Sequence, residues 1–184
     1  MTSKIFCIGF QKTGTSSLGN ALHALGFSVG VSTKVLNRRM NWRAPDPRPK
    51  IIEKVLAVVD GVDAIQDSPN AFIYRELDAA HPGAKFILTI RDTADWLESY
   101  RRFFPDQNNP LRSWMYGVER LSGNEALYCK KYDAQNAEIV EYFADRPDDL
   151  LVMDLSKGDG WLDLVNFLGK DVLKPFPHAN KNKR

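Results

Sequence analysis

Apolar residues along the chain form two patterns, short continuous runs and stripes with helical spacing. The runs are typical of strands buried on both faces of a parallel sheet, and they predict strands at Lys4–Gly9, Phe27–Val31, Ala64–Gln66, Lys85–Ile90 and Leu150–Leu155. The stripes and cap residues predict helices at Ser16–Leu25, Lys50–Val59, Ala71–Ala80, after Asp92 or Thr93, and at Leu111–Leu121, Ala126–Phe143 and Trp161–Leu168. Strands alternating with helices predict an α/β fold: an open, mostly parallel sheet with helices on both faces, in three α/β/α layers, with the first strand at the centre.

Ligands of such sheets bind beyond the carboxyl ends of the strands. This rule selects three loops, which follow the first strand, Gln66 and Ile90. A fourth segment, Ser32–Pro49, has no clean period and carries several arginines and prolines. It is interpreted either as a lid of functional length or as a solvated insertion.

Composition limits the classes of function. The 184 residues are 43% hydrophobic and 26% charged, as expected for one soluble domain over residues 1–184. The net charge of +2 is too small for a general polyanion surface, so no nucleic-acid partner is expected and any anion site is local. Cys7 and Cys129 fit neither a zinc-ligand spacing nor a disulfide framework. No apolar run approaches the roughly 18 residues that span a bilayer, and no secretory signal is evident, so a cytoplasmic protein is expected.

The first loop, Gly9-Phe-Gln-Lys-Thr-Gly-Thr-Ser-Ser17, connects a buried strand to an amphipathic helix. In this geometry backbone N–H groups and the helix N-terminus surround an anion such as phosphate. Gly9 and Gly14 have the spacing of the nucleotide P-loop, but Thr15 stands where that motif has lysine, and the lysine is Lys12 inside the loop. The alternative is a tight strand-to-helix turn with an exposed lysine.

Two motifs, in this order, resemble the sulfotransferases that use 3′-phosphoadenosine 5′-phosphosulfate (PAPS). GFQKTGTSSL is similar to their 5′-phosphosulfate loop, in which a lysine precedes a (S/T/G)GT triplet at the start of the first helix. Arg91 at a strand end, with Ser99 eight residues later, matches the pair that binds the 3′-phosphate in that family. The segments GWLDLVNFLG and PFPHAN near the C-terminus are also similar, whereas the resemblance is weak through Ser32–Pro49 and Phe104–Ala126.

The resemblance implies a P-loop-like sulfotransferase that moves a sulfuryl group from PAPS to an acceptor hydroxyl or amine and releases adenosine 3′,5′-bisphosphate (PAP), with no metal. Negative charge grows on the bridging phosphate oxygen as the S–O bond breaks, and Lys12 is the candidate cation for it. Taken singly, Arg91 could instead pair with an acid, and Ser99 could be a solvated helix position. The expected donor-binding residues are Gln11, Lys12, Thr13, Gly14, Thr15 and Ser16 for the 5′-phosphate and Arg91 and Ser99 for the 3′-phosphate.

An acceptor hydroxyl needs a base, which is a His, Glu or Asp in this superfamily. Asp67 follows the predicted strand Ala64–Gln66, and its DSP pattern resembles the family's position for this group. The alternative is that Asp67 caps the helix that starts near Asn70. His178, in the basic tail, lies either near the cofactor or in a frayed terminus.

The acceptor is expected to be a small molecule, a sugar or a lipid, and neither it nor the oligomeric state is predicted. Aromatic residues that could line its pocket, or could equally be core, are Trp42, Phe72, Tyr74 and Trp114. Two other functions stay open. A P-loop kinase would need Mg²⁺, with Asp154 at a strand end as a candidate carboxylate, and the displaced lysine counts against it. The second open function is a nucleotide-binding module that catalyses no reaction.

Overall fold

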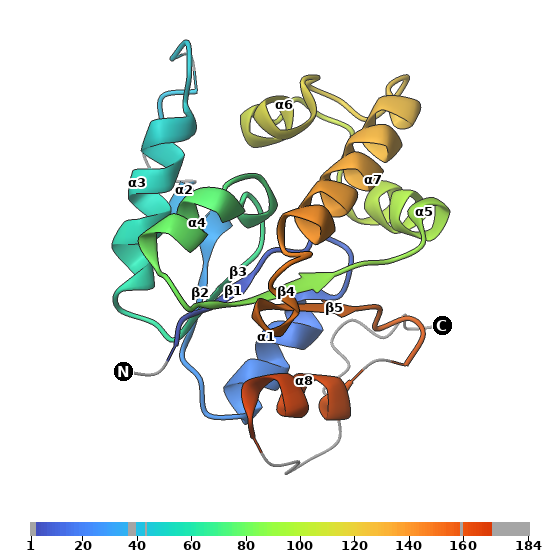
Figure 1. Ribbon diagram of the computed structural model, residues 1–184. Coiled ribbons are helices and arrows are strands. Elements are labelled where there is room, and N and C mark those ends of the chain that lie inside the picture. The colour runs from blue at the N-terminus through green and yellow to red at the C-terminus, as the bar shows by residue number, and fades with distance from the viewer. Residues whose placement is uncertain (1–2, 37–39, 43, 159, 171–184) are drawn as a thin grey trace.

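The sheet is open, parallel and five-stranded. The structure, a computed structural model, describes residues 3–36, 40–42, 44–158 and 160–170 (Figure 1). Its strands are β1 Ile5–Cys7, β2 Val29–Val31, β3 Ala64–Gln66, β4 Lys85–Thr89 and β5 Leu150–Met153. They lie in the order β2-β3-β1-β4-β5, and every neighbouring pair is parallel. The predicted fold class is confirmed, and β1 is the central strand.

Helices cover both faces of the sheet (Figure 1). Two of them, α1 and α8, pack on one face, and the others lie on the opposite side. None of the helices in the described ranges combines the length and the apolar character needed to cross a membrane. The helices, in chain order, are α1 Thr15–Ala24, α2 Ser32–Leu36, α3 Arg48–Val59, α4 Tyr74–Ala80, α5 Thr93–Phe103, α6 Pro110–Tyr116, α7 Glu125–Tyr142 and α8 Trp161–Leu168, with the 3₁₀ helices η1 Asn70–Phe72 and η2 Pro147–Asp149.

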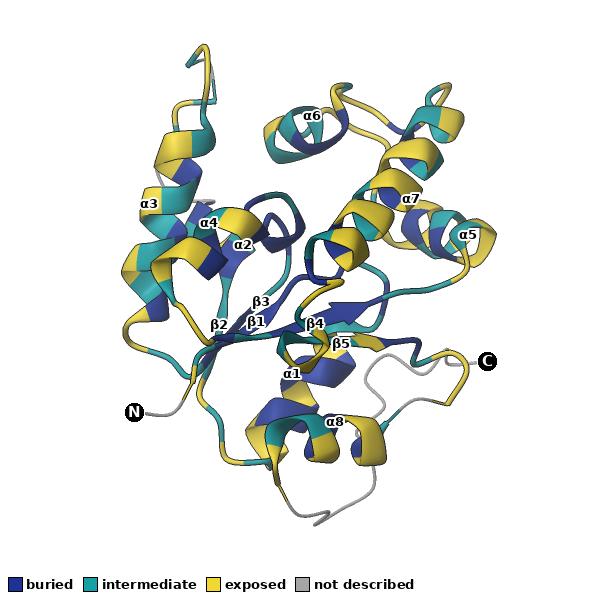
Figure 2. Cartoon of the chain, in the orientation of Figure 1, coloured by how far each residue is buried: buried dark blue, intermediate teal, exposed yellow. Residues whose placement is uncertain are grey.

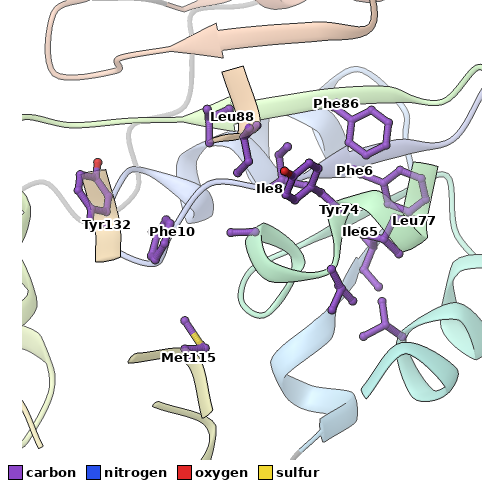
Figure 3. Close-up of a cluster of buried hydrophobic side chains, with 14 of the residues drawn as sticks. Phe6, Ile8, Phe10, Ile65, Tyr74, Leu77, Phe86, Leu88, Met115 and Tyr132 are labelled. Atoms are coloured by element: carbon purple, nitrogen blue, oxygen red, sulfur yellow. The ribbon is translucent and has the colours of Figure 1, made fainter. Parts of the chain in front are cut away.

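Each face of the sheet has its own buried cluster, which explains why the inner strands β1 and β4 are mostly apolar. Successive side chains of β1 alternate between the faces, so Cys7 joins the cluster under α1 and α8 while Phe6 joins the larger one. Burial raises the pKa of the Cys7 thiol to about 12, as expected of a core residue. In Figure 2 the inner strands β1 and β4 are mostly dark blue, whereas the edge strands β2 and β5 are largely half-buried or exposed. Figure 3 shows the larger cluster, which includes Phe10 and Tyr132.

The sequence predicts no regular structure for the segment Ser32–Pro49, but the structure has helices in part of it. Its first five residues form α2, and the next helix, α3, already begins at Arg48. The fold holds α2 in place, because the Ser32 hydroxyl donates to the Asn70 side-chain oxygen at 2.6 Å and Leu36 is fully buried. Such contacts leave no periodic signal in five residues. Its arginines Arg38, Arg39 and Arg43 lie outside the described residues.

Two predicted helices have different bounds. The helix expected at Ala71–Ala80 is divided into η1 and α4, with Ile73 between them. The helix expected at Leu111–Leu121 ends at Tyr116, because Gly117 adopts a left-handed φ of 80° that stops it.

Candidate active site

The loop after β1 lies tightly against β4. At Gly9 the two backbones are so close that a Cβ atom would stand 2.0 Å from the hydroxyl oxygen of Thr89 and 2.7 Å from its carbonyl oxygen. The Thr13 hydroxyl donates to the Phe10 carbonyl oxygen at 2.6 Å and lies 2.6 Å from the Thr89 hydroxyl. Thr13 is therefore buried inside the loop, where its side chain braces the turn.

α1 begins at this loop without a side-chain cap. Its N-cap residue is Gly14, whose left-handed φ of 104° favours glycine; a Cβ atom there would also lie 2.6 Å from Leu155 Cδ1, the flexible end of that side chain. The first turn contains no acidic residue, and within it Thr15 is half-buried and Ser16 exposed. The first amides of a helix and its dipole attract negative charge, so this end of α1 suits an anion.

Lys12 lies in the same loop, with a left-handed φ of 73° that is uncommon for a residue with a side chain. Its Nζ lies 3.7 Å from the centroid of the Phe103 ring, and Phe103 is 61% exposed. Burial and the nearby Arg91 charge lower the pKa of Lys12 from 10.5. Within the described residues neither Lys12 nor Arg91 pairs with a carboxylate. Two cations without an acid favour an anionic ligand.

Arg91 lies at the junction of β4 and α5. The Asp92 carboxylate caps α5, as predicted, by accepting from the N–H groups of Ala94 and Asp95. The Arg91 N–H donates to the Tyr132 hydroxyl at 2.9 Å, and that hydroxyl donates to the Arg91 carbonyl oxygen, also at 2.9 Å. The Nε atom of Arg91 is buried and has no hydrogen-bond partner among the described residues. Such an unpaired charged donor is costly, and an acceptor oxygen on a ligand would relieve the cost.

One face of α5 meets the first loop. Trp96, Ser99 and Phe103 share this face because they are spaced three and four residues apart. Trp96 Nε1 donates to the Gln11 carbonyl oxygen at 3.0 Å, and the Phe103 ring contacts Lys12. Ser99, half-buried, lies between these two contacts and so faces the loop.

Asp67 follows β3 and adopts a left-handed φ of 80°. Its Oδ2 accepts from the Thr33 hydroxyl at 2.7 Å, and its Oδ1 accepts from the Ser68 N–H at 2.8 Å. The carboxylate does not cap η1, because the Asn70 N–H bonds to the carbonyl oxygen of Asp67 at 3.2 Å. The alternative of a helix cap is therefore wrong, and the side chain is half-buried beside α2.

Gln11 joins these parts of the site. Its side-chain oxygen accepts from the Ser68 hydroxyl at 2.5 Å, next to Asp67, and its Nε2 donates to the Tyr116 hydroxyl at 2.8 Å. Both ends of the side chain are thus engaged by the protein. Gln11 braces the first loop against the loop after β3 and against α6.

The structure therefore brings three predicted loops to one edge of the sheet, and it adds residues that the sequence analysis missed. Thr33 follows β2, so the rule that selected the other strand ends would also have selected it. Tyr132 lies inside a long helix, and nothing in the sequence marks it.

The remaining candidates are the aromatic residues for an acceptor pocket, the strand-end carboxylate Asp154 and the histidine of the basic tail. Tyr74 is buried, and its hydroxyl donates to Glu138 at 3.1 Å, so it belongs to the core rather than to a pocket. Phe72 and Trp114 are half-buried with ring centroids 5.8 Å apart. Asp154 accepts from the Ser156 N–H at 3.0 Å and lies 3.4 Å from Lys157 Nζ. His178 lies outside the described residues.

The chain is similar to one protein-family profile, one curated protein and two solved structures. The profile of the sulfotransferase domain family matches residues 4–125 and 107–184. Ava biosynthesis cluster protein M of Aspergillus versicolor is 30% identical over 109 residues, which are 52% of this chain and 41% of that protein. The chain thus spans about two fifths of the length of the curated relative it matches.

A crystal structure of a sulfotransferase from Alicyclobacillus acidocaldarius aligns with a TM-score of 0.57 at 17% identity, over 99% of this chain and 87% of that one. This likeness concerns the fold. A gluconokinase from Sinorhizobium meliloti aligns with a TM-score of 0.45 at 16% identity, over 79% of this chain and 98% of that one, a score too low to indicate a shared fold. Because the family profile covers well over half of the residues, the chain belongs to the sulfotransferase domain family.

Proposed function

We propose that this protein is a PAPS-dependent sulfotransferase that moves a sulfuryl group to a hydroxyl or amine of a small-molecule, sugar or lipid acceptor. The observation that carries the proposal is the pair of cations Lys12 and Arg91. They lie within electrostatic reach of each other, and neither has a carboxylate partner among the described residues. A ligand with two separate phosphate groups would neutralise both.

The residues present fit such a donor. The 5′-phosphosulfate would bind at the uncapped start of α1, through the backbone of Thr13 and Gly14 and the backbone and hydroxyls of Thr15 and Ser16. The 3′-phosphate would bind to Arg91, whose buried Nε has no hydrogen-bond partner in the described ranges, and to the Ser99 hydroxyl. Gln11 would hold the loop in shape.

PAPS supplies an activated sulfuryl group, and the chain supplies charge and a base. Lys12 would stabilise the negative charge that grows on the bridging phosphate oxygen as the S–O bond breaks. Its contact with Phe103 and its lowered pKa indicate a partly desolvated ammonium group, whose charge acts more strongly than it would in water.

Asp67 is the proposed base. As the acceptor oxygen attacks sulfur, its proton would pass to the Asp67 carboxylate. The hydrogen bonds from Thr33 and Ser68 fix the orientation of this carboxylate. The Gln11–Ser68 contact ties its loop to the loop that holds Lys12. The two proposed catalytic residues thus belong to one connected frame.

The donor site is tested by thermal melting with PAP, ADP or ATP, each with and without Mg²⁺. A ligand at 100 times its dissociation constant stabilises a fold by about 2.7 kcal/mol, which a melt detects easily. We expect a shift with PAP that needs no metal, that is lost in Arg91→Ala and that is kept in Arg102→Ala. Arg102 is the matched control because it lies on α5 and is 68% exposed, paired with Glu98.

Two outcomes would contradict the proposal. A shift with ATP only in the presence of Mg²⁺ would favour a kinase. A PAP shift that both arginine variants retain equally would place the ligand elsewhere on the protein.

A further inference from the structure

We propose that Tyr132 is a positioning residue that fixes Arg91 for the 3′-phosphate of the donor. The inference rests on the proposed function, because it assigns a role within the same donor site. Tyr132 lies on α7, far from both phosphate-binding motifs in the sequence. Its hydroxyl nevertheless bonds to both backbone groups of Arg91, at 2.9 Å each.

These two bonds lie between two positions that are held in other ways. The Ile90 N–H donates to the Met153 carbonyl oxygen at 2.8 Å, and Asp92 caps α5, but neither contact uses the backbone N–H or carbonyl of Arg91. Arg91 follows the last residue pair of the β4–β5 ladder and precedes α5, so its N–H and carbonyl belong neither to the sheet nor to the helix. One hydroxyl accepts from the N–H and donates to the carbonyl, which fixes the peptide groups on both sides of the Cα atom. The direction in which the Arg91 side chain leaves the backbone is therefore set by Tyr132.

The ring of Tyr132 cannot move independently of the first loop. It is 1% exposed and stacks on Trp96, with centroids 4.2 Å apart and planes 12° apart. It also meets the Phe10 ring edge-on at 5.1 Å. Phe10 belongs to the loop itself, and Trp96 donates to the carbonyl of Gln11, one residue before Lys12.

Tyr132 thus connects the two segments that would hold the two phosphates. A ligand with phosphates at both ends of a nucleoside is bound tightly only when the protein groups for each are held at a matching separation. Burial raises the pKa of Tyr132 to about 12, so the phenol keeps the proton that it donates to Arg91 across the physiological range.

The test compares Tyr132→Phe with Tyr128→Phe by calorimetric titration with PAP and with adenosine 5′-monophosphate (AMP), which lacks the 3′-phosphate. Tyr128 is the matched control, because it lies one turn earlier on α7, is fully buried, and its hydroxyl does not bond to the Arg91 backbone. In Tyr132→Phe we expect the preference for PAP over AMP to fall about tenfold or more, while the affinity for AMP changes less than about twofold. Tyr128→Phe should keep the wild-type preference.

The outcomes separate the two claims. A wild-type protein that binds PAP no better than AMP overturns the donor site and the role of Tyr132 with it. A wild type that prefers PAP, with Tyr132→Phe keeping that preference or Tyr128→Phe losing as much of it, overturns the role of Tyr132 alone. Loss of packing would weaken both ligands equally, so the PAP-to-AMP ratio separates positioning from structural damage.

Hydrogen exchange of the wild-type Arg91 amide gives a second measurement that needs no variant. We expect protection at Arg91, although it lies outside the sheet and the helix. Exchange of this amide as fast as that of a solvent-exposed amide would overturn the proposed role of the Tyr132–Arg91 hydrogen bonds.

Discussion

At the scale of single residues, the site is defined by two cations, Lys12 and Arg91, that have no carboxylate partner within the described part of the chain. The pKa of Lys12 is lowered by burial and by Arg91, and its ammonium group rests on an exposed aromatic ring. Holding like charges together is unfavourable for the free protein. An anionic ligand adds attractive interactions with both cations that offset this repulsion, which is why the pair indicates binding rather than stability.

Lys12→Met should separate an enzyme from a binding module. Because Lys12 would act on charge that develops during the reaction, we expect kcat for sulfuryl transfer to fall about 10²–10³-fold. The dissociation constant for PAP should change only several-fold, since the amides of α1 and Arg91 remain. The measurement is the rate of PAP release with an acceptor that the wild type modifies. Equal losses in rate and in PAP affinity would contradict the assignment.

The pH dependence gives an independent check on Lys12. Only the charged form can act, so kcat/KM, which reports the free protein, should decline as pH rises through the pKa of Lys12, below the ordinary value of 10.5. Lys12→Arg keeps its charge at such pH and should lose this decline, even if it is slower throughout. A decline that is unchanged in Lys12→Arg would assign it to another group.

At the scale of elements, the phosphate-binding turn depends on the close approach of the first loop to β4. A methyl group at position 9 would lie 2.0 Å from a Thr89 side-chain oxygen and 2.7–2.8 Å from its backbone, and β4, which is paired with β1 on one side and β5 on the other, has little room to move. Gly9→Ala should therefore lower the free energy of unfolding by about 1–3 kcal/mol and weaken PAP binding. Gly61→Ala is the control, because the nearest atom there is 3.7 Å away. Denaturant titration measures both, and equal stabilities would contradict the crowding.

Elements were predictable where burial alone decides them. The strand at Lys85–Ile90 and the helix at Trp161–Leu168 were predicted directly, because burial on both faces leaves a continuous apolar run and burial on one face leaves a helical period. α2 could not be predicted in this way, since contacts of Ser32 and Leu36 with distant segments hold its five residues. The first loop, Arg91 and Asp67 were predictable as candidates because each follows a strand. Tyr132 was not, because its role depends on how α7 packs.

At the scale of the molecule, the parallel sheet explains why residues far apart in the sequence form one site. The carboxyl ends of β1, β3 and β4 meet at one edge, where they present the first loop, Asp67 and Arg91, and β2 adds Thr33. Helices that pack on the sheet hold these loops in position; Tyr132 of α7, for example, bonds to the backbone of Arg91. The acceptor would approach from this edge, and its identity is the specificity question that follows.

A crystal structure of the protein with PAP would show directly where the two phosphates bind. We expect the 5′-phosphate at the start of α1, within hydrogen-bond distance of Lys12 and of backbone N–H groups between Thr13 and Ser16. We expect the 3′-phosphate on Arg91 and Ser99. A nucleotide bound with its phosphates exchanged, or bound away from Lys12 and Arg91 at saturating concentration, would contradict the proposed donor site.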